Sequence, residues 1–184
     1  MPCLPVAFHG WQFVILAEVA NFAMLRRHVG RARADTLVGD AQYNILMGFG
    51  GTDALDGAAG SDVLIGGARV DTLRGGLGND IFQFATPGEG GDLILDFHAV
   101  AGDDDAIRVS ASGFGGGLVA GVLAASQFQS RADNLAQDAT DRFIFRTTDA
   151  TLWFDVDGTG VASSVLIADL QAGAILTAPD ILIF

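Results

Sequence analysis

The 184-residue chain has few of the features that brace or anchor a protein. Cys3 is its only cysteine, which excludes an internal disulfide and a zinc site built from cysteines. It has no run of 18 apolar residues, so we expect no transmembrane helix. Lysine is absent, and ten arginines stand against 22 acidic residues. The net charge of −12 disfavours nucleic acid and anionic membranes as partners and favours cations.

Glycine, by contrast, is abundant and regularly spaced. From Gly30 to residue 83 the chain divides without an insertion into GRARADTLV, GDAQYNILM, GFGGTDALD, GAAGSDVLI, GGARVDTLR and GGLGNDIFQ. Position 1 is Gly in every row. Position 6 is acidic or an amide, as Asp35, Asn44, Asp53, Asp62, Asp71 and Asp80. Position 8 is large and apolar, as Leu37, Leu46, Leu55, Leu64, Leu73 and Phe82. This nine-residue period predicts a repeat architecture.

Each column of the repeat has a physical meaning. Glycine suits tight turns with positive φ, in which backbone carbonyls converge, and position 6 adds a carboxylate to each turn. The apolar residue at position 8 lies in a short extended segment and faces one side. Stacked turns would therefore line up a thin apolar core and a series of oxygen cages. Carboxylate and carbonyl oxygens are the ligands that Ca²⁺ takes.

The thin core also indicates that the repeats need the metal. One buried apolar side chain in each nonapeptide contributes ~1.5–3 kcal/mol. Ordering the backbone of that nonapeptide costs ~1–2 kcal/mol in entropy for each of its residues, so the total cost exceeds the gain. A column of Asp side chains would in addition repel itself without cations. We therefore expect folding of the repeats to be linked to metal binding.

The rows resemble the RTX, or haemolysin-type, calcium-binding repeat, whose pattern is GGxGxDxUx with U a large apolar residue. GGLGNDIFQ matches every motif position, GAAGSDVLI and GFGGTDALD lack only the second Gly, and the first two rows are degenerate. The resemblance implies an all-β fold, a parallel β-roll in which two nonapeptides complete one turn. Ca²⁺ then sits between repeats n and n+2 on the same side of the roll.

Carried over to this chain, the resemblance implies about two to three calcium ions. The best site uses Asp62 with the turns 57–60 and 75–78. The second uses Asp53 with the turns 48–51 and 66–67. The residues expected to bind metal are Gly48, Gly51, Asp53, Gly57, Ala58, Gly60, Asp62, Gly66, Gly67, Asp71, Gly75, Gly76, Gly78 and Asp80.

Four arginines interrupt the pattern. Arg69 stands where the fourth-position Gly of its row belongs, and Arg74 ends the same row. Both argue against a full site around Asp71. Arg31 and Arg33 in the first row indicate that this repeat is a cap rather than a metal site.

The segments before and after the repeat give other signals. WQFVILAEVANFAMLRR (11–27) lacks the features of a signal peptide, so we interpret it as a helix that ends at Gly30; the remnant of a longer parent protein is an equal alternative. A helical segment here could shield the open end of the roll. We divide the chain into this N-terminal segment (1–29), the β-roll (30–84) and a β-rich C-terminal cap (85–184).

The cap contains several predicted strands. We expect strands at Leu93–Phe97 and Ala106–Val109, and a hairpin made of Arg142–Arg146 and Thr151–Val156. The segments SVLIADL and DILIF predict two further strands near the end of the chain.

Acidic residues outside the repeat are further candidate ligands. Asp92, Asp96 and Asp103–Asp105 could hold another cation, with a solvated acidic loop as the alternative. Asp155 and Asp157 in DVDGTG are either calcium ligands or part of a plain Asp-Gly turn. They do not form an EF-hand, because the twelfth position of such a loop is a leucine here.

The final segment DILIF resembles the uncleaved C-terminal signal of type I secretion substrates. With the repeat, it implies a secreted, extracellular calcium-binding protein whose partner is the type I secretion machinery. We expect no enzymatic activity, since the chain has no HExxH and no GxSxG motif. Two alternatives remain: an accessory part of a secreted RTX enzyme or toxin such as a protease or lipase, and a calcium-dependent adhesion or self-association protein.

Overall fold

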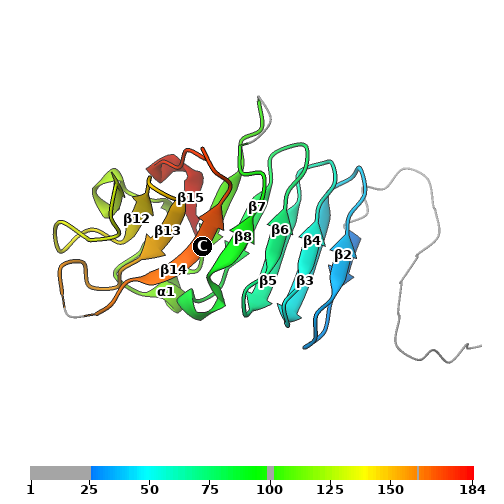
Figure 1. Ribbon diagram of the computed structural model, residues 1–184, viewed down its shortest axis with the longest axis horizontal. Helices are drawn as coiled ribbons and strands as arrows, with labels where there is room; N and C mark the ends of the chain where they lie inside the picture. Colours follow the sequence, from blue (N-terminus) through cyan, green and yellow to red (C-terminus); the bar gives the residue numbers. More distant parts are fainter. Residues whose placement is uncertain (1–25, 99–101, 161) are drawn as a thin grey trace, which may run out of the picture.

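Two β-sheets make up most of the computed structural model, which describes residues 26–98, 102–160 and 162–184 (Figure 1). Sheet A contains, in spatial order, β1 (Arg26–Val29), β3 (Asn44–Gly50), β5 (Val63–Ala68), β7 (Ile81–Phe84), β9 (Ala106–Val109), β15 (Ile181–Ile183) and β10 (Gly121–Val122). Sheet B contains β11 (Phe128–Arg131), β12 (Phe143–Arg146), β13 (Thr151–Phe154), β14 (Val165–Leu170), β8 (Asp92–Ile94), β6 (Thr72–Arg74), β4 (Ala54–Asp56) and β2 (Thr36–Val38).

Within the described residues, helices are few and short. They are α1 (Ala111–Phe114) and the 3-10 helices η1 (Pro87–Glu89), η2 (Ala125–Gln127) and η3 (Ala178–Asp180). In the part of the chain that the structure describes, no helix is long and apolar enough to cross a membrane.

The repeat folds as the predicted parallel β-roll. Successive nonapeptides place their short strands alternately in sheet B and sheet A, and each strand pairs in parallel with the strand 18 residues away. Leu37 thus lies beside Leu55, and Leu46 beside Leu64. Two nonapeptides therefore complete one turn of the roll.

The position-8 side chains form the core between the sheets. Those of the second to sixth rows are at most 2% exposed, whereas Leu37 at the end of the roll is partly exposed. Ile94 in β8 and Ile107 in β9 are also fully buried and continue the same column. The core of the roll is consequently one side chain deep and runs without a break into the C-terminal region.

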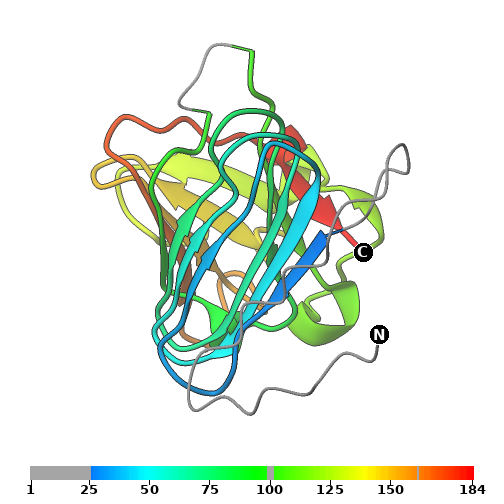
Figure 2. The same ribbon diagram turned by 90° about the vertical axis from the view of Figure 1, so that its right-hand side faces the viewer.

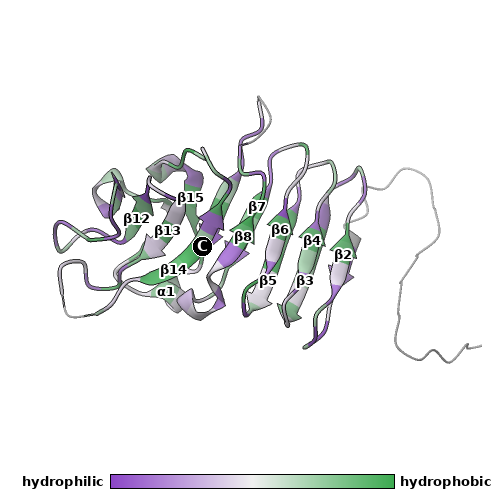
Figure 3. Ribbon diagram, viewed as in Figure 1, coloured by the Kyte–Doolittle hydropathy of each residue, from purple (hydrophilic) through white to green (hydrophobic). Residues whose placement is uncertain are grey.

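The C-terminal region adds an antiparallel meander and a more conventional core. β12, β13 and β14 form an antiparallel sheet that joins the roll because β14 pairs in parallel with β8. Phe114, Phe143 and Phe154 pack together with ring centroids 5.0–6.1 Å apart. β12 and β14 are coloured as hydrophobic over much of their length (Figure 3).

The last strand of the chain is inserted into sheet A rather than added at its edge. β15 pairs in parallel with β9 and antiparallel with β10. Ile181 and Ile183 are buried, and the backbone N–H of Phe184 donates to the carbonyl of Val109. The roll and the C-terminal region therefore share both sheets.

One structural prediction is wrong where the structure can test it. The helix expected to end at Gly30 is replaced over Arg26–Val29 by the strand β1. The physical reason is tertiary pairing: β3 offers an open parallel edge, and Val29 lies in register with Met47. The rest of that predicted helix, like most of the predicted segment 1–29, lies outside the described residues.

The predicted C-terminal strands are confirmed with small changes of length. β9 has the expected bounds, and the strand expected at Leu93–Phe97 is the shorter β8. The hairpin is formed by β12 and β13, and the segments SVLIADL and DILIF contain β14 and β15.

Candidate metal centres

The turns of the roll stack along two edges, which are seen end-on in Figure 2. We call the stack of turns 30–35, 48–53 and 66–71 the Asp53 edge. The stack of turns 39–44, 57–62 and 75–80 is the Asp62 edge. This division follows from the roll itself, because alternate nonapeptides start from opposite sheets.

Position 6 forms a hydrogen-bonded ladder along each edge. On the Asp62 edge, the backbone N–H of Asn44 donates to Oδ1 of Asp62 at 2.7 Å, and that of Asp62 donates to Oδ1 of Asp80 at 2.7 Å. On the Asp53 edge, the N–H groups of Asp35 and Asp53 donate to Oδ1 of Asp53 and Asp71 at 2.8 and 2.7 Å. One oxygen of each carboxylate is thereby fixed in place.

The second oxygen of each carboxylate has no hydrogen-bond partner although it is buried. This holds for Oδ2 of Asp53, Asp62, Asp71 and Asp80, whose residues are at most 2% exposed. A buried carboxylate oxygen without a donor is costly, because it has lost its water and gained nothing in exchange. Such an atom fits a cation ligand.

Backbone carbonyls lie beside these free oxygens. A Cβ placed on Gly57 would lie 2.5 Å from Oδ2 of Asp62 and 2.5 Å from the carbonyl oxygen of Gly75. At Gly48, the same construction meets Oδ2 of Asp53 and the carbonyl oxygen of Gly66. Only glycine leaves this space open at position 1. The oxygen-only donor set of carboxylate and carbonyl suits Ca²⁺.

The turns also require a left-handed backbone at positions 2 and 4. In the last four rows, φ at these positions lies between 71° and 139°, in Phe49, Gly51, Ala58, Gly60, Gly67, Arg69, Gly76 and Gly78. Three of these residues are not glycine and still adopt the left-handed conformation, which costs an L-residue roughly 1–2 kcal/mol. The turns therefore keep their geometry where the motif glycine is missing, but the backbone of Phe49, Ala58 and Arg69 is strained.

Burial makes the position-6 carboxylates reluctant to ionise. Loss of water raises the pKa of Asp53, Asp62 and Asp71 above the usual value, and raises the pKa of Asp80 to about 7. Neighbouring carboxylates of the ladder add to the effect, as the charge of Asp105 does for the pKa of Asp80. A bound cation would relieve both causes, so the ladders favour metal over empty, charged turns.

The first turns of the two edges differ, because Oδ1 of Asn44 on the Asp62 edge is buried and has no hydrogen-bond partner. Oδ2 of Asp35 accepts a hydrogen bond from the backbone N–H of Arg31 at 2.6 Å. The side-chain amide of Asn44 donates to Oδ1 of Asp40 and of Asp62 at 3.3 and 3.2 Å. The backbone of Arg31, and not its side chain, donates this hydrogen bond, so the interpretation of the first repeat as a cap stays a prediction.

The prediction that Arg69 and Arg74 disfavour a full metal site around Asp71 stays a prediction. Arg74 pairs with Asp56 at 3.3 Å and with Asp96 at 3.6 Å. Arg69 keeps the left-handed turn with φ of 84°. Asp71 is fully buried and its Oδ2 is as free of hydrogen bonds as those of the other rungs.

Two residues of the ladders, Asp92 and Asp105, lie outside the nine-residue repeat. The N–H of Asp71 donates to Oδ1 of Asp92, and the N–H of Asp80 donates to Oδ1 of Asp105, each at 2.9 Å. These residues are 21 and 25 positions away, so they break the nine-residue period. A signal was present nevertheless. Each Asp stands two residues before a buried Ile, the same spacing that joins positions 6 and 8 in the repeat.

Several of the other acidic candidates have structural partners, but Oδ1 of Asp157 is buried and has none. Both oxygens of Asp96 accept backbone N–H groups, from Gly75 and Gly76, each at 2.9 Å. Asp103 accepts from the N–H of Gly78 at 3.3 Å. Asp155 accepts from the N–H of Asp157 at 3.1 Å, which is the geometry of an Asp-Gly turn.

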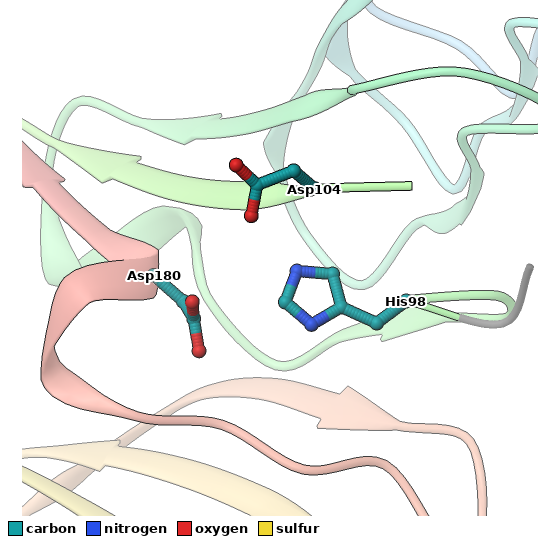
Figure 4. A group of neighbouring side chains, drawn as sticks. All are labelled: His98, Asp104 and Asp180. Atoms are coloured by element: carbon teal, nitrogen blue, oxygen red, sulfur yellow. The ribbon is translucent and has the colours of Figure 1, made fainter. Parts of the chain in front are cut away.

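A mixed cluster lies next to the end of the Asp62 edge. One ring nitrogen of His98 and one carboxylate oxygen of each of Asp104 and Asp180 lie within 4.8 Å of one another (Figure 4). Two of the three are already engaged. Nε2 of His98 lies 2.7 Å from the carbonyl oxygen of Asp105, and Oδ2 of Asp180 accepts from the N–H and hydroxyl of Thr177. Asp104 is exposed. The cluster resembles a capping arrangement more than a ligand cage.

Comparison with known proteins identifies the repeat. Residues 29–64 and 56–83 match the family model of the RTX calcium-binding nonapeptide repeat (4 copies). No curated protein matches the chain significantly.

Solved structures with similar folds include two subunits of the Azotobacter vinelandii mannuronan C5-epimerase. AlgE6R3 is 31% identical, with 83% of this chain and 80% of that chain covered and a TM-score of 0.49. AlgE6R2 is 26% identical, with 88% and 93% covered and a TM-score of 0.48. Because both TM-scores are below 0.5, the assignment rests on the repeat match and on the roll itself.

Proposed function

The chain is an RTX-repeat protein that binds calcium, and we propose that calcium drives folding of the roll when it enters the turns outside the cell. This dependence would couple folding to type I secretion. The observation that carries this proposal is the row of buried, unpartnered Oδ2 atoms along both edges. Without a cation these atoms oppose folding, and with one they become ligands. The fold is thereby linked to the calcium concentration.

The proposed sites are those of the two edges. Asp62 with the turns at Gly57 and Gly75 forms the main site, and Asp53 with the turns at Gly48 and Gly66 forms the second. Weak sites of roughly 10⁻⁴–10⁻³ M, as in extracellular calcium modules, would stay empty in the cytosol and fill outside the cell.

The burial of the segment proposed as the secretion signal supports the link to export. β15 carries the apolar residues of the proposed secretion signal, and Ile181 and Ile183 are buried between the sheets. A secretion machine can read this segment only before the fold has closed around it. Export of an unfolded chain, followed by folding in calcium, satisfies both requirements.

Export has a direct test. The full chain is expressed in a bacterial host with a type I exporter, with and without a substitution of Ile181 and Ile183 by Asp. We expect the parent chain in the medium and the variant in the cytoplasm. Equal export of both would contradict the assignment of the signal. Activity of the purified chain on casein or lipid esters would instead favour the enzyme-linked alternative.

Self-association is a second candidate function, favoured by the open end of the roll. Among the described strands, β1 and β2 have a neighbour on one side only. Val29 and Val38 on these strands are each 54% exposed. Unpaired parallel edges with apolar side chains can add further strands. Light scattering that shows calcium-dependent growth in mass would support this role, and a constant monomer mass would exclude it.

A further inference from the structure

The ladder of the Asp53 edge continues beyond the residues that match the repeat family. Its last rung is Asp92, the first residue of β8, whereas the match ends at residue 83. Asp92 is fully buried, and its Oδ1 accepts a hydrogen bond from the N–H of Asp71 at 2.9 Å. The loop 85–92, which has no nonapeptide pattern, thus supplies a carboxylate where the next repeat would have done so.

Two free oxygens converge at this point. Oδ2 of Asp71 and Oδ2 of Asp92 are both buried and lack a hydrogen-bond partner. A Cβ placed on Gly66 would lie 2.8 Å from Oδ2 of Asp92 and closer still to Oδ2 of Asp71. The two carboxylates therefore point at the same space over Gly66. No described ion pair involves either of them.

The Asp62 edge ends differently. Its last rung, Asp105, also accepts a ladder hydrogen bond through Oδ1, but its Oδ2 accepts the backbone N–H of His98 at 2.8 Å. The protein itself satisfies that end. At the Asp53 edge the second oxygen of the last rung, Asp92, has no such donor.

We propose that Asp71 and Asp92 hold a further divalent cation of the calcium class at the junction between the last repeat of the Asp53 edge and the C-terminal region. The donor atoms are carboxylate oxygens only, which favours Ca²⁺ over softer metals. This inference rests on the proposed function, because it uses the same calcium supply, and it adds a ligand that the repeat pattern does not contain.

The ion would tie the two regions together. β8 pairs with β6 of the roll on one side and with β14 on the other, where Asp92 lies in register with Ala168. A cation at Asp92 therefore fixes the strand on which the C-terminal meander is laid down. Arg69, which interrupts the motif in this turn, lies in the same turn as Asp71 and leaves its carboxylate in place.

The test counts calcium in the full chain. Equilibrium dialysis with elemental analysis, at saturating calcium, is applied to the parent chain, to Asp92→Asn and to Asp169→Asn. Asp169 is a matched control because it removes the same charge from β14, one residue from the partner of Asp92, and is partly exposed. We expect Asp92→Asn to bind one ion fewer and Asp169→Asn to bind the parental number.

Each outcome has a distinct meaning. A folded Asp92→Asn chain with the parental calcium count overturns this inference alone. A parent chain that binds no calcium overturns the proposed function as well. If Asp92→Asn does not fold, crystals of the parent chain grown with calcium decide: density for an ion bonded to Oδ2 of both Asp71 and Asp92 supports the site, and its absence there overturns it.

Discussion

The roll and the C-terminal region solve the problem of burial in opposite ways. The roll places one large apolar side chain in each nonapeptide between its sheets and buries carboxylates along both edges. The C-terminal region packs Phe114, Phe143 and Phe154 against one another and keeps its ion pairs, such as Arg146–Asp149, nearer the surface. Under the proposed function the roll depends on a cation, whereas the C-terminal region has an aromatic core of its own.

The difference suggests that the roll and the C-terminal region have separate roles in folding, although they share continuous sheets. The C-terminal strands β14 and β15 lie beside β8 and β9, where the two ladders end. A region that holds its own core can present these strands as a template. Calcium then extends order from the template into the repeats.

Removal of calcium should separate the two regions most strongly. In chelator, at a pH above the raised pKa values of about 7 for Asp80 and about 8 for Asp92, we expect the roll to lose its hydrogen-bonded structure, because its buried carboxylates would be charged and unpartnered, while the aromatic core persists. Hydrogen exchange measured by mass spectrometry should show lost protection in β3 to β7 and retained protection in β12 to β14. Equal loss in both regions would show that the template depends on calcium too.

Truncation of the aromatic core should have the next largest effect. Phe154→Ala removes a buried ring from the cluster with Phe114 and Phe143, and should cost ~3–5 kcal/mol in the free energy of unfolding. The number of bound calcium ions at saturation should stay the same. A lower ion count in the folded variant would mean that the core and the sites are not separate. Thermal unfolding in calcium gives the first quantity, and dialysis gives the second.

Neutralisation of one rung should weaken calcium-driven folding. Asp62→Asn removes a charged ligand oxygen, and we expect the midpoint of the calcium titration to rise by about tenfold or more, which is ~1.4 kcal/mol for each factor of ten. Asp133→Asn is the control, since it removes the same charge from a partly exposed pair with Arg131 in the C-terminal region, worth little. Equal shifts in both variants would point to general electrostatics rather than to ligation.

Acid should stabilise the metal-free roll. The folded pKa values of Asp80 and Asp92 are raised from 3.8 to about 7 and about 8, chiefly by burial. Protonation therefore favours the folded state: this contribution is fully present below pH 3.8 and is lost as the pH rises through 7 and 8. Melting of the chelator-treated chain across this window should show a falling Tm with rising pH. A Tm that rises with pH would contradict the burial of these groups.

Restoration of a motif glycine should give the smallest effect, in the stabilising direction. Ala58 has φ of 73°, so Ala58→Gly relieves a left-handed strain of roughly 1–2 kcal/mol, less the entropy that glycine adds to the unfolded chain. The matched control is Ala54→Gly in β4, where glycine should destabilise by roughly 0.5–1 kcal/mol. Chemical unfolding in calcium measures both, and destabilisation by Ala58→Gly would show that the turn is not strained.

The fold of the repeat could be predicted from the sequence because its contacts are periodic. Residues 18 apart are neighbours in the roll, so the columns at positions 6 and 8 predicted the ladder and the core directly. Asp92 and Asp105 were weighed only as further ligands, because loops of irregular length hide their register with Asp71 and Asp80. The replacement of a helix by β1 is tertiary in origin, since it depends on the open edge of β3 rather than on local pattern.

The most direct test of calcium-dependent folding is a titration of the chelator-treated chain with Ca²⁺, followed by circular dichroism and calorimetry in parallel, with Mg²⁺ as the control. The buried, unpartnered oxygens of the two edges predict a cooperative gain of β-structure with Ca²⁺ and none with Mg²⁺. A chain whose β-structure is already complete in chelator, and does not change as calcium is added, would contradict calcium-dependent folding.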